Sequence, residues 1–455
     1  MMHRRRFLNT IGTAALAGTL APRLASGSVF VPDEGSEVPC RAITGLPGHH
    51  WFGYYDKLQF SPEGRYILGM ETMFEGRPPT SDDVIGVGMV DTEMDDRWIE
   101  FGTSRAWGWQ QGCMLQWIPG AEREVIWNDA EDTEDGRRFV SRILNVETGE
   151  RRTLPMPVYA LTPDGRYAVT TDFARIDRMR PGYGYVGGSG GFLDEEASEK
   201  GGIYRMDLES GEAELIVPYS DVAQVPHLGK DVADKWHYFN HLLVNTDGSR
   251  FLFLNRYRDF TLTDEMRADP EANAKYVSGQ YTTRMFTAGL DGSGLYEIDT
   301  GDTSHIIWRD PDHILAWTRG QDQKRPDEWG THEGLEPSFW LFKDQTSDVE
   351  RVGADVMTQN GHQTYVPNTD NEWILNDTYP SRESREQTLY LYHIPTGREV
   401  TLGRFYEPPE YAGEWRTDLH PRASRDGTKV CIDSTHESGK GRQMYLLDIS
   451  GIVKA

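Results

Sequence analysis

The sequence predicts an all-β fold: a seven-bladed β-propeller with four-stranded antiparallel blades around a central channel. Seven segments repeat a turn followed by an apolar strand, at spacings of roughly 45 to 80 residues, which suits four strands per blade with loop insertions. Within them, apolar residues alternate or run briefly and then break at Asp-Gly or Pro-Asp-Gly, which is a strand pattern rather than a helical one. The 47 glycines and the aromatic content of 11% are typical of a protein with many turns and packed sheets.

The N-terminus is predicted to be an export signal rather than part of the fold. An arginine triplet at residues 4–6 precedes Phe-Leu, and a modest apolar stretch over residues 11–20 is followed by small residues around Ala25. We therefore expect residues 1–28 to be a twin-arginine signal peptide and the mature protein to be periplasmic or secreted. No apolar run of about 18 residues follows, so we expect no membrane-spanning segment.

Residues 40–455 are predicted to form one propeller domain. Three early repeats, beginning at Tyr54, Cys113 and Val158, contain the turn and the strand without a histidine. Four later repeats each open on a histidine ahead of the turn, namely His241, His305, His362 and His420. Short strands with polar turn pairs, such as the one from Ile203, supply the outer strands of the blades.

Three stretches are longer than blade turns require and are predicted to lie on the rim. Residues 179–200 are glycine-rich with an acidic end and read as a mobile loop, residues 259–280 have a charged, helical composition, and residues 319–337 are polar. Loops of this length usually act as lids or are disordered.

Charge and cysteine content exclude several classes of protein. The formal net charge of −25 argues against binding to nucleic acid or to anionic membrane surfaces. An acidic protein can still bind anionic sugars where cations are concentrated, and five cations near the repeats are candidates: Lys57, Arg256, Arg258, Arg416 and Arg422. Three cysteines do not make a disulfide framework, and we expect Cys113 and Cys431 to be buried as small apolar residues.

The four repeated histidines predict a metal site. Equivalent positions of successive blades converge on the central channel, and imidazole is the commonest protein ligand for transition metals. Because a divalent ion needs three or four ligands, one imidazole could instead accept a proton. We prefer His241 for that role because His237, Tyr238 and Asn240 crowd the same strand edge. Alternatively, the polar side chains at this position would only form hydrogen bonds with unpaired backbone groups at the ends of the strands.

The first two repeats supply a second group of polar and aromatic residues, within GHHWFGYYDK and RAWGWQQGCMLQW. Aromatic faces stack on sugar rings, whereas amides and cations bind hydroxyls and carboxylates. With two cations from the set above, the predicted substrate-binding residues are His50, Tyr54, Lys57, Trp109, Gln111 and Arg422. Trp51, Trp117 and Trp127 are expected in the core.

The later repeats resemble those of the oligogalacturonate lyases. The resemblance rests on GIYRMDLESGEAELIV, HLLVNTDG, SHIIWRDPD, GHQTY and LHPRASRDG, and covers the second half of the chain best. Members of that family are seven-bladed propellers that bind manganese through three histidines and a glutamine and cleave short uronate oligosaccharides by β-elimination. The resemblance implies His241 as the base and His305 and His362 as metal ligands. His420 lies in the matching strand start, where the family has further ligands.

Two positions depart from the family pattern. The family's catalytic arginine falls at Gly202, and its glutamine ligand falls near Trp415, with Asp418 beside it. We therefore add Asp418 to the predicted ligand set. Arg256 becomes the candidate catalytic cation, because β-elimination requires the charge of the uronate carboxylate to be offset.

The predicted function is thus that of a monomeric lyase, dependent on a divalent metal (Mn²⁺), that cleaves uronate-containing oligosaccharides by β-elimination. It would be a divergent member of the family or belong to a related group with another substrate. The alternative is a non-catalytic periplasmic propeller, similar to TolB, with a structural metal and a binding or scaffold role. A glycoside hydrolase ranks third, because no pair of carboxylates spaced across a cleft stands out in the sequence.

Overall fold

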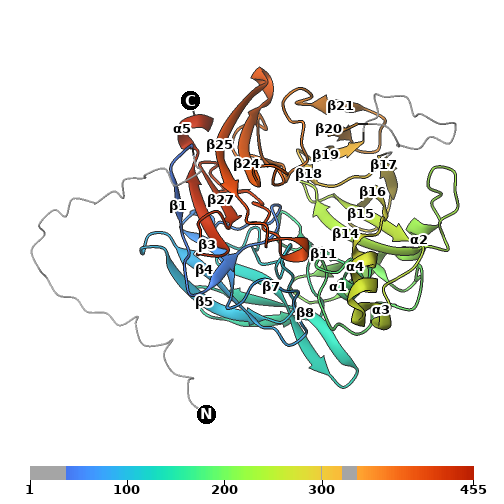
Figure 1. Cartoon of the computed structure of the whole chain (residues 1–455). Helices are drawn as coiled ribbons and strands as arrows, with labels where there is room; N and C mark the ends of the chain where they lie inside the picture. The colour runs from blue at the N-terminus through green and yellow to red at the C-terminus, as the bar shows by residue number, and fades with distance from the viewer. Residues whose placement is uncertain (1–36, 299, 320–335, 455) are drawn as a thin grey trace, which may run out of the picture.

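The computed structural model describes residues 37–298, 300–319 and 336–454, and it confirms the predicted seven-bladed propeller (Figure 1). The predicted signal peptide lies outside the described residues, as does most of the predicted insertion at 319–337. No helix among the described residues is long and apolar enough to cross a membrane.

The described strands form seven four-stranded antiparallel sheets, in which the first strand of each blade lies innermost. Blade 1 contains β2 (His49–Trp51), β3 (Tyr66–Thr72), β4 (Ile85–Asp91) and β5 (Arg97–Ser104). Blade 2 contains β6 (Gln116–Trp117), β7 (Glu124–Thr133), β8 (Gly136–Asn145) and β9 (Arg151–Leu154). Blade 3 contains β10 (Ala160–Leu161), β11 (Tyr167–Thr170), β12 (Gly202–Asp207) and β13 (Ala213–Pro218).

Blades 4 to 7 carry the four repeated histidines. Blade 4 contains β14 (Trp236–Val244), β15 (Arg250–Arg258), β16 (Thr282–Gly289) and β17 (Tyr296–Ile298). Blade 5 contains β18 (Ile306–Trp308), β19 (His313–Arg319), β20 (Pro337–Lys343) and β21 (Val349–Val352). Blade 6 contains β22 (Thr364–Tyr365), β23 (Trp373–Asp377), β24 (Glu386–His393) and β25 (Arg398–Tyr406). Blade 7 contains β26 (Arg422–Ala423), β27 (Lys429–Ser434), β28 (Gln443–Asp448) and β1 (Cys40–Ala42).

The turn that repeats in the sequence has a common hydrogen-bonding pattern between the first two strands of a blade. In blade 1 the side chain of Ser61 accepts the N–H of Tyr66 at 3.0 Å, while the carbonyl of Ser61 accepts the N–H of Gly64 at 2.9 Å. Gly64 has a φ of +74°, a conformation that favours glycine. Thr162, Asn245 and Ser424 accept hydrogen bonds in the same way in blades 3, 4 and 7. The Asp-Gly signal therefore marks a specific turn.

Short helices occupy the connections between strands. The described ones are α1 (Phe173–Met179), α2 (Tyr219–Ala223), α3 (Asp264–Ala268), α4 (Pro270–Ser278) and α5 (Ser450–Val453). Helices α3 and α4 fall within residues 259–280, where the composition is helical, and Asp269 caps α4 by accepting the N–H of Glu271 at 2.9 Å. Residues 180–201 contain neither helix nor strand.

The core lies between neighbouring blades. Trp51, Trp117 and Trp127 are buried as predicted, and so are Cys113 and Cys431. Between blades 4 and 5, the Leu252 and Leu254 side chains pack in one cluster with apolar residues of blade 5. Each blade thus buries an apolar face against the next, as the alternating strand pattern requires.

The N-terminal strand closes the ring. Strand β1 pairs with β28, with Cys40 opposite Leu447 and Ala42 opposite Tyr445, so the two ends of the chain share blade 7 (Figure 1). We expect a chain that starts at Ile43 to unfold at a midpoint roughly 5 °C or more lower than one that starts at Glu37, because it leaves the β28 edge without a partner. Thermal unfolding followed by circular dichroism measures the difference. Equal midpoints would mean that this closure adds nothing to stability.

Candidate active site

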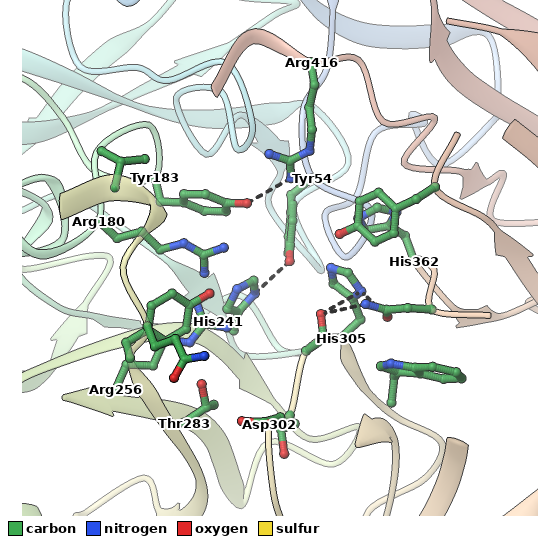
Figure 2. Close-up of a pocket in the computed structure, with 18 of the residues that line it drawn as sticks. Tyr54, Arg180, Tyr183, His241, Arg256, Thr283, Asp302, His305, His362 and Arg416 are labelled. Carbon is green, nitrogen blue, oxygen red and sulfur yellow. Dashed lines mark hydrogen bonds between the residues drawn. The ribbon is translucent and has the colours of Figure 1, made fainter. Parts of the chain in front are cut away.

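A polar pocket of about 660 Å³ lies where the inner strands of blades 4 to 7 begin (Figure 2). All four repeated histidines line it. The rings of His305 and His420 each lie with their centroid 4.2 Å from that of His362, and the His241 centroid lies 6.5 Å from that of His305. The repeat therefore brings the four imidazoles to one place, with His241 set apart from the other three.

Two of these histidines have unusual backbone conformations. His241 has a φ of +53° at the irregularity in β14, and His420 has a φ of +42°. Buried hydrogen bonds hold both, because the N–H of His241 donates to the Tyr159 hydroxyl at 2.8 Å and that of His420 donates to Asp377 at 3.2 Å. Positive φ at a residue other than glycine costs free energy and is concentrated at functional sites.

The surroundings of His241 keep its imidazole neutral. Its Nδ1 lies 2.8 Å from the hydroxyl of Tyr54, which leaves Nε2 as the ring nitrogen available to a ligand in the pocket (Figure 2). Burial holds the pKa of His241 well below 6.5, and the nearby positive charges of Arg180 and Lys57 lower this pKa further. A neutral imidazole in this position can accept a proton.

His362, His420 and Asp418 form the one group among the described residues whose donor atoms could hold a metal, all within 4.8 Å of one another. His420 Nε2 is buried and makes no hydrogen bond, and burial holds the pKa of His420 well below 6.5. Asp377 lies 2.9 and 3.0 Å from Nδ1 of His362, which leaves Nε2 of His362 as the donor atom. Two imidazoles and a carboxylate fit a divalent ion such as Mn²⁺ or Zn²⁺.

Arg416 and His305 lie beside the group formed by His362, His420 and Asp418 and contact it. Asp418 also pairs with Arg416, whose Nε lies 3.2 Å from Oδ1 and whose Nη2 lies 2.9 Å from Oδ2. His305 lies beside His362 with the two rings tilted by 50°, and its Nδ1 is 3.0 Å from the Asn360 side-chain oxygen, so its Nε2 is the nitrogen left for a ligand. Of the four predicted metal ligands, three therefore form the group and His305 adjoins it.

Arginine and tyrosine side chains form part of the lining of the pocket. Arg180, Arg256 and Arg416 line it together with Tyr183, Tyr281 and Tyr379. Of the predicted substrate-binding residues, Tyr54 lines this pocket, and so do Arg256, the predicted catalytic cation, and Arg416, another of the five candidate cations. Arg180 rather than Arg256 is the arginine whose charge acts on His241.

The remaining predicted substrate-binding residues lie outside this pocket because each serves the packing of the fold. Trp109 is 1% exposed and packs with Trp51 and Trp107. Arg422 is buried against Asp433, with 2.8 Å between Nη2 and Oδ1. Lys57 pairs with Asp56 at 2.5 Å beside a separate, smaller cavity.

Gln111 and His50 are also buried away from the pocket. Gln111 accepts a hydrogen bond from Tyr159 at 3.1 Å, and Tyr159 in turn holds the backbone of His241, so Gln111 supports the site indirectly. His50 lies 3.2 Å from the Gln443 side-chain oxygen. Aromatic and amide composition therefore did not distinguish the wall of a site from the core beneath it.

Sequence reasoning missed Arg180 and Tyr183, which lie at the start of the glycine-rich insertion. The available signal was the segment RPGYGY, where an arginine and two tyrosines follow the predicted rim boundary. Tyr183 accepts a hydrogen bond from Arg416 at 3.0 Å, and Tyr185 stacks on Phe173 with 4.2 Å between ring centroids. These contacts anchor the start of the insertion against the pocket.

His50 supports a prediction on acid stability. Burial lowers the pKa of His50 to about 4, whereas in the unfolded chain it is near 6.5. The unfolded state therefore binds more protons between these values, so stability is present above pH 6.5 and is lost as the pH falls towards 4, by about 3 kcal/mol. In urea unfolding at pH 7 and pH 4.5, we expect His50→Gln to lose less stability on acidification than the unaltered chain. His393→Gln, at a partly exposed site, is the control. A pH dependence unchanged by His50→Gln would contradict this expectation.

Comparison with known proteins supports the fold. No protein-family model matches the sequence, and no curated protein sequence matches it either. Among solved structures, an oligogalacturonate lyase from Vibrio parahaemolyticus is 14% identical, with a TM-score of 0.58 over 92% of this chain and 95% of that one.

Two further solved structures are more distant. An oligogalacturonate lyase in complex with manganese is 13% identical, with a TM-score of 0.41 over 93% of this chain and 96% of that one. TolB from Acinetobacter baumannii is 12% identical, with a TM-score of 0.39 over 85% of this chain and 80% of that one. The likeness to the Vibrio enzyme, which spans nearly the whole chain, shows that this protein has the propeller fold of an oligogalacturonate lyase.

Proposed function

We propose that this protein is a metal-dependent lyase that cleaves uronate-containing oligosaccharides by β-elimination. The observation that carries the proposal is the composition of one pocket. A neutral histidine with a free Nε2, a group of two imidazoles and a carboxylate, and three arginines all meet there. A fold shared with a lyase supports the proposal only weakly, because one fold hosts many activities.

The arginines bind and neutralise the acidic substrate. The carbon next to a uronate carboxylate releases its proton only when the negative charge that develops on the carboxylate is offset. Arg180, whose charge acts on His241, supplies that offset beside the base, and Arg416 supplies it beside Asp418. Arg256, the cation proposed from the sequence, also lines the pocket and binds substrate there.

His241 removes the proton. Its lowered pKa keeps the imidazole neutral at neutral pH, and the contact with Tyr54 orients the ring so that Nε2 can face the substrate. As the carbon–hydrogen bond breaks, its electron pair forms the double bond and the glycosidic oxygen leaves from the next carbon. His362, His420 and Asp418 would hold the divalent ion, with His305 as a further ligand. When bound, the ion supplies a Lewis acid for the carboxylate.

The ion in this proposal is Mn²⁺, the substrate is a soluble acidic oligosaccharide, and the protein acts as a monomer after twin-arginine export to the periplasm or the medium.

The test is an absorbance screen, because elimination creates an unsaturated uronate that absorbs in the ultraviolet. Purified protein supplied with Mn²⁺ should release the chromophore from uronate oligosaccharides, and a chelator should stop the release. Products that are cleaved but saturated would instead identify a hydrolase.

A further inference from the structure

A segment of blade 1 lies across the central channel next to the candidate active site. It consists of residues 53–57, between β2 and β3, and we call it the channel segment. Tyr54 lines the active-site pocket, where the inner strands of blades 4 to 7 begin (Figure 2). Asp56 and Lys57 line a second cavity of about 330 Å³, beside the last residues of β10 and β14. The channel segment therefore lies between the pocket and the opposite end of the channel.

The start of the channel segment is fixed by blades 2 and 7. The Asp433 carboxylate accepts the N–H groups of Phe52 and Gly53 at 3.2 and 3.1 Å. Arg422 pairs with the same carboxylate. Gly53 has a φ of +100°, and a Cβ on it would lie 2.9 Å from the backbone of Gln111, so only glycine suits this position. The residues that follow Gly53 thus leave from a backbone that is held in place.

The Tyr55 hydroxyl reaches blade 5 and contacts one backbone unit twice. It donates to the Ile306 carbonyl at 2.9 Å and accepts the Ile306 N–H at 3.1 Å. Ile306 is the first residue of β18, the innermost strand of blade 5, and it directly follows His305. Tyr55 and Ile306 are both buried, so bulk water cannot satisfy these backbone groups in place of the hydroxyl. Tyr55 therefore fixes the backbone beside His305.

The ring of Tyr55 also packs against two imidazoles of the site. Its centroid lies 5.9 Å from that of His305, with the ring planes at 86°, and 5.4 Å from that of His362. Asn360 holds His305 from another direction, through the contact of 3.0 Å with Nδ1. Together Tyr55 and Asn360 determine where Nε2 of His305 lies relative to His362.

The position of His305 matters for a metal. The candidate metal group, His362, His420 and Asp418, contributes three donor atoms. Divalent ions of this kind usually take four or more ligands, and His305 is the imidazole next to His362. Residues that hold a metal ligand in place commonly set the affinity for the metal.

We propose that Tyr55 is a positioning residue for the metal, which holds the start of β18 so that His305 completes the ligand set of the candidate metal group. This inference deepens the proposed function and rests on its metal site. Tyr55 is not among the described residues that line the active-site pocket, so it acts through His305 and not by touching the substrate. Blade 1, which has no repeated histidine, thereby controls how the histidine of blade 5 is used.

The test is a calorimetric titration of the whole chain with Mn²⁺ alone, after a chelator has removed any bound metal. We expect Tyr55→Phe to bind Mn²⁺ about 10- to 100-fold more weakly than the unaltered chain, because the ring stays and only the hydroxyl is lost. The matched control is Tyr296→Phe, whose hydroxyl donates to the Thr346 carbonyl at 3.0 Å at the outer edge of blades 4 and 5. The control should bind Mn²⁺ within about twofold of the unaltered chain.

A double variant shows whether Tyr55 acts through His305. His305→Ala should weaken Mn²⁺ binding by itself. Adding Tyr55→Phe to it should then change the affinity by less than about twofold, because the ligand that Tyr55 positions is already gone. Losses that add in full would mean that Tyr55 supports the fold or another ligand, and they would overturn the proposal. An unchanged Mn²⁺ affinity in Tyr55→Phe would overturn it as well.

Thermal unfolding without metal separates a loss of positioning from a loss of fold. We expect the midpoint of Tyr55→Phe in chelator to lie within about 5 °C of that of the unaltered chain. A variant that does not fold would make Tyr55 a residue of the fold alone and contradict the proposal.

The same measurements distinguish this inference from the proposed function. An active lyase whose Mn²⁺ affinity does not depend on Tyr55 would remove the positioning role and leave the proposed function. Mn²⁺ binding that depends on Tyr55 through His305, in a chain that releases no unsaturated product, would keep the positioning role and remove the lyase. An unaltered chain that binds no Mn²⁺ would overturn both.

Discussion

His241→Ala is expected to reduce kcat by about 10²–10⁴-fold, which is the usual contribution of a general base. Because Nδ1 of His241 contacts the Tyr54 hydroxyl, Nε2 is the nitrogen left to accept the proton, and burial keeps it neutral. The variant should keep its full content of Mn²⁺, because His241 lies outside the group formed by His362, His420 and Asp418. Turnover measured by ultraviolet absorbance and metal measured by mass spectrometry test both parts.

The control for this variant is Tyr54→Phe. It removes the hydroxyl 2.8 Å from Nδ1 of His241 but leaves the imidazole in place, so we expect a smaller loss of about tenfold. If His241→Ala instead loses its metal, His241 is a ligand and the base lies elsewhere. If kcat stays unchanged, the proposed mechanism is wrong.

His420→Ala is expected to remove the metal and, with it, all activity. Nε2 of His420 is buried without a hydrogen-bond partner, so an ion is the partner best suited to it. Asp377→Asn should have a milder effect, with metal affinity lowered about 10- to 100-fold, because Asp377 holds both the His362 ring and the backbone of His420. Metal analysis after dialysis, together with the absorbance assay, measures each loss.

The matched control for His420→Ala is His313→Ala, which removes a partly buried imidazole paired with Asp310 and far from the group in sequence. It should keep both metal and activity. Loss of thermal stability in His420→Ala, with no activity in any chain, would favour the alternative of a scaffold propeller with a structural ion. Retention of metal by His420→Ala would show that the ion binds elsewhere.

The histidines of the pocket could be predicted from the sequence, whereas residues that follow no repeat could not be assigned reliably to the site or to the core. The histidines repeat at one position of four blades, and a repeat in sequence becomes a convergence in space because the blades share an axis. Trp109 and Arg422 carried no such repeat, and their residue types suit a buried core and a buried ion pair as well as a sugar site. Arg180 sits in an insertion that follows no blade period, so nothing in its spacing points to the pocket.

The sequence by itself determined the seven-bladed fold, the buried tryptophans and the set of histidines that meet in the channel. The fold and the histidine set follow from a local period that the chain repeats, and the buried tryptophans follow from the tendency of aromatic side chains to pack in cores. Only the tertiary structure decided that His241 stands apart from the other three, that Asp418 joins His362 and His420, and that Tyr55 of blade 1 holds the backbone beside His305. These placements depend on which side chains from distant blades and loops come together in one pocket. Tertiary packing decides this, and a repeated sequence pattern does not encode it.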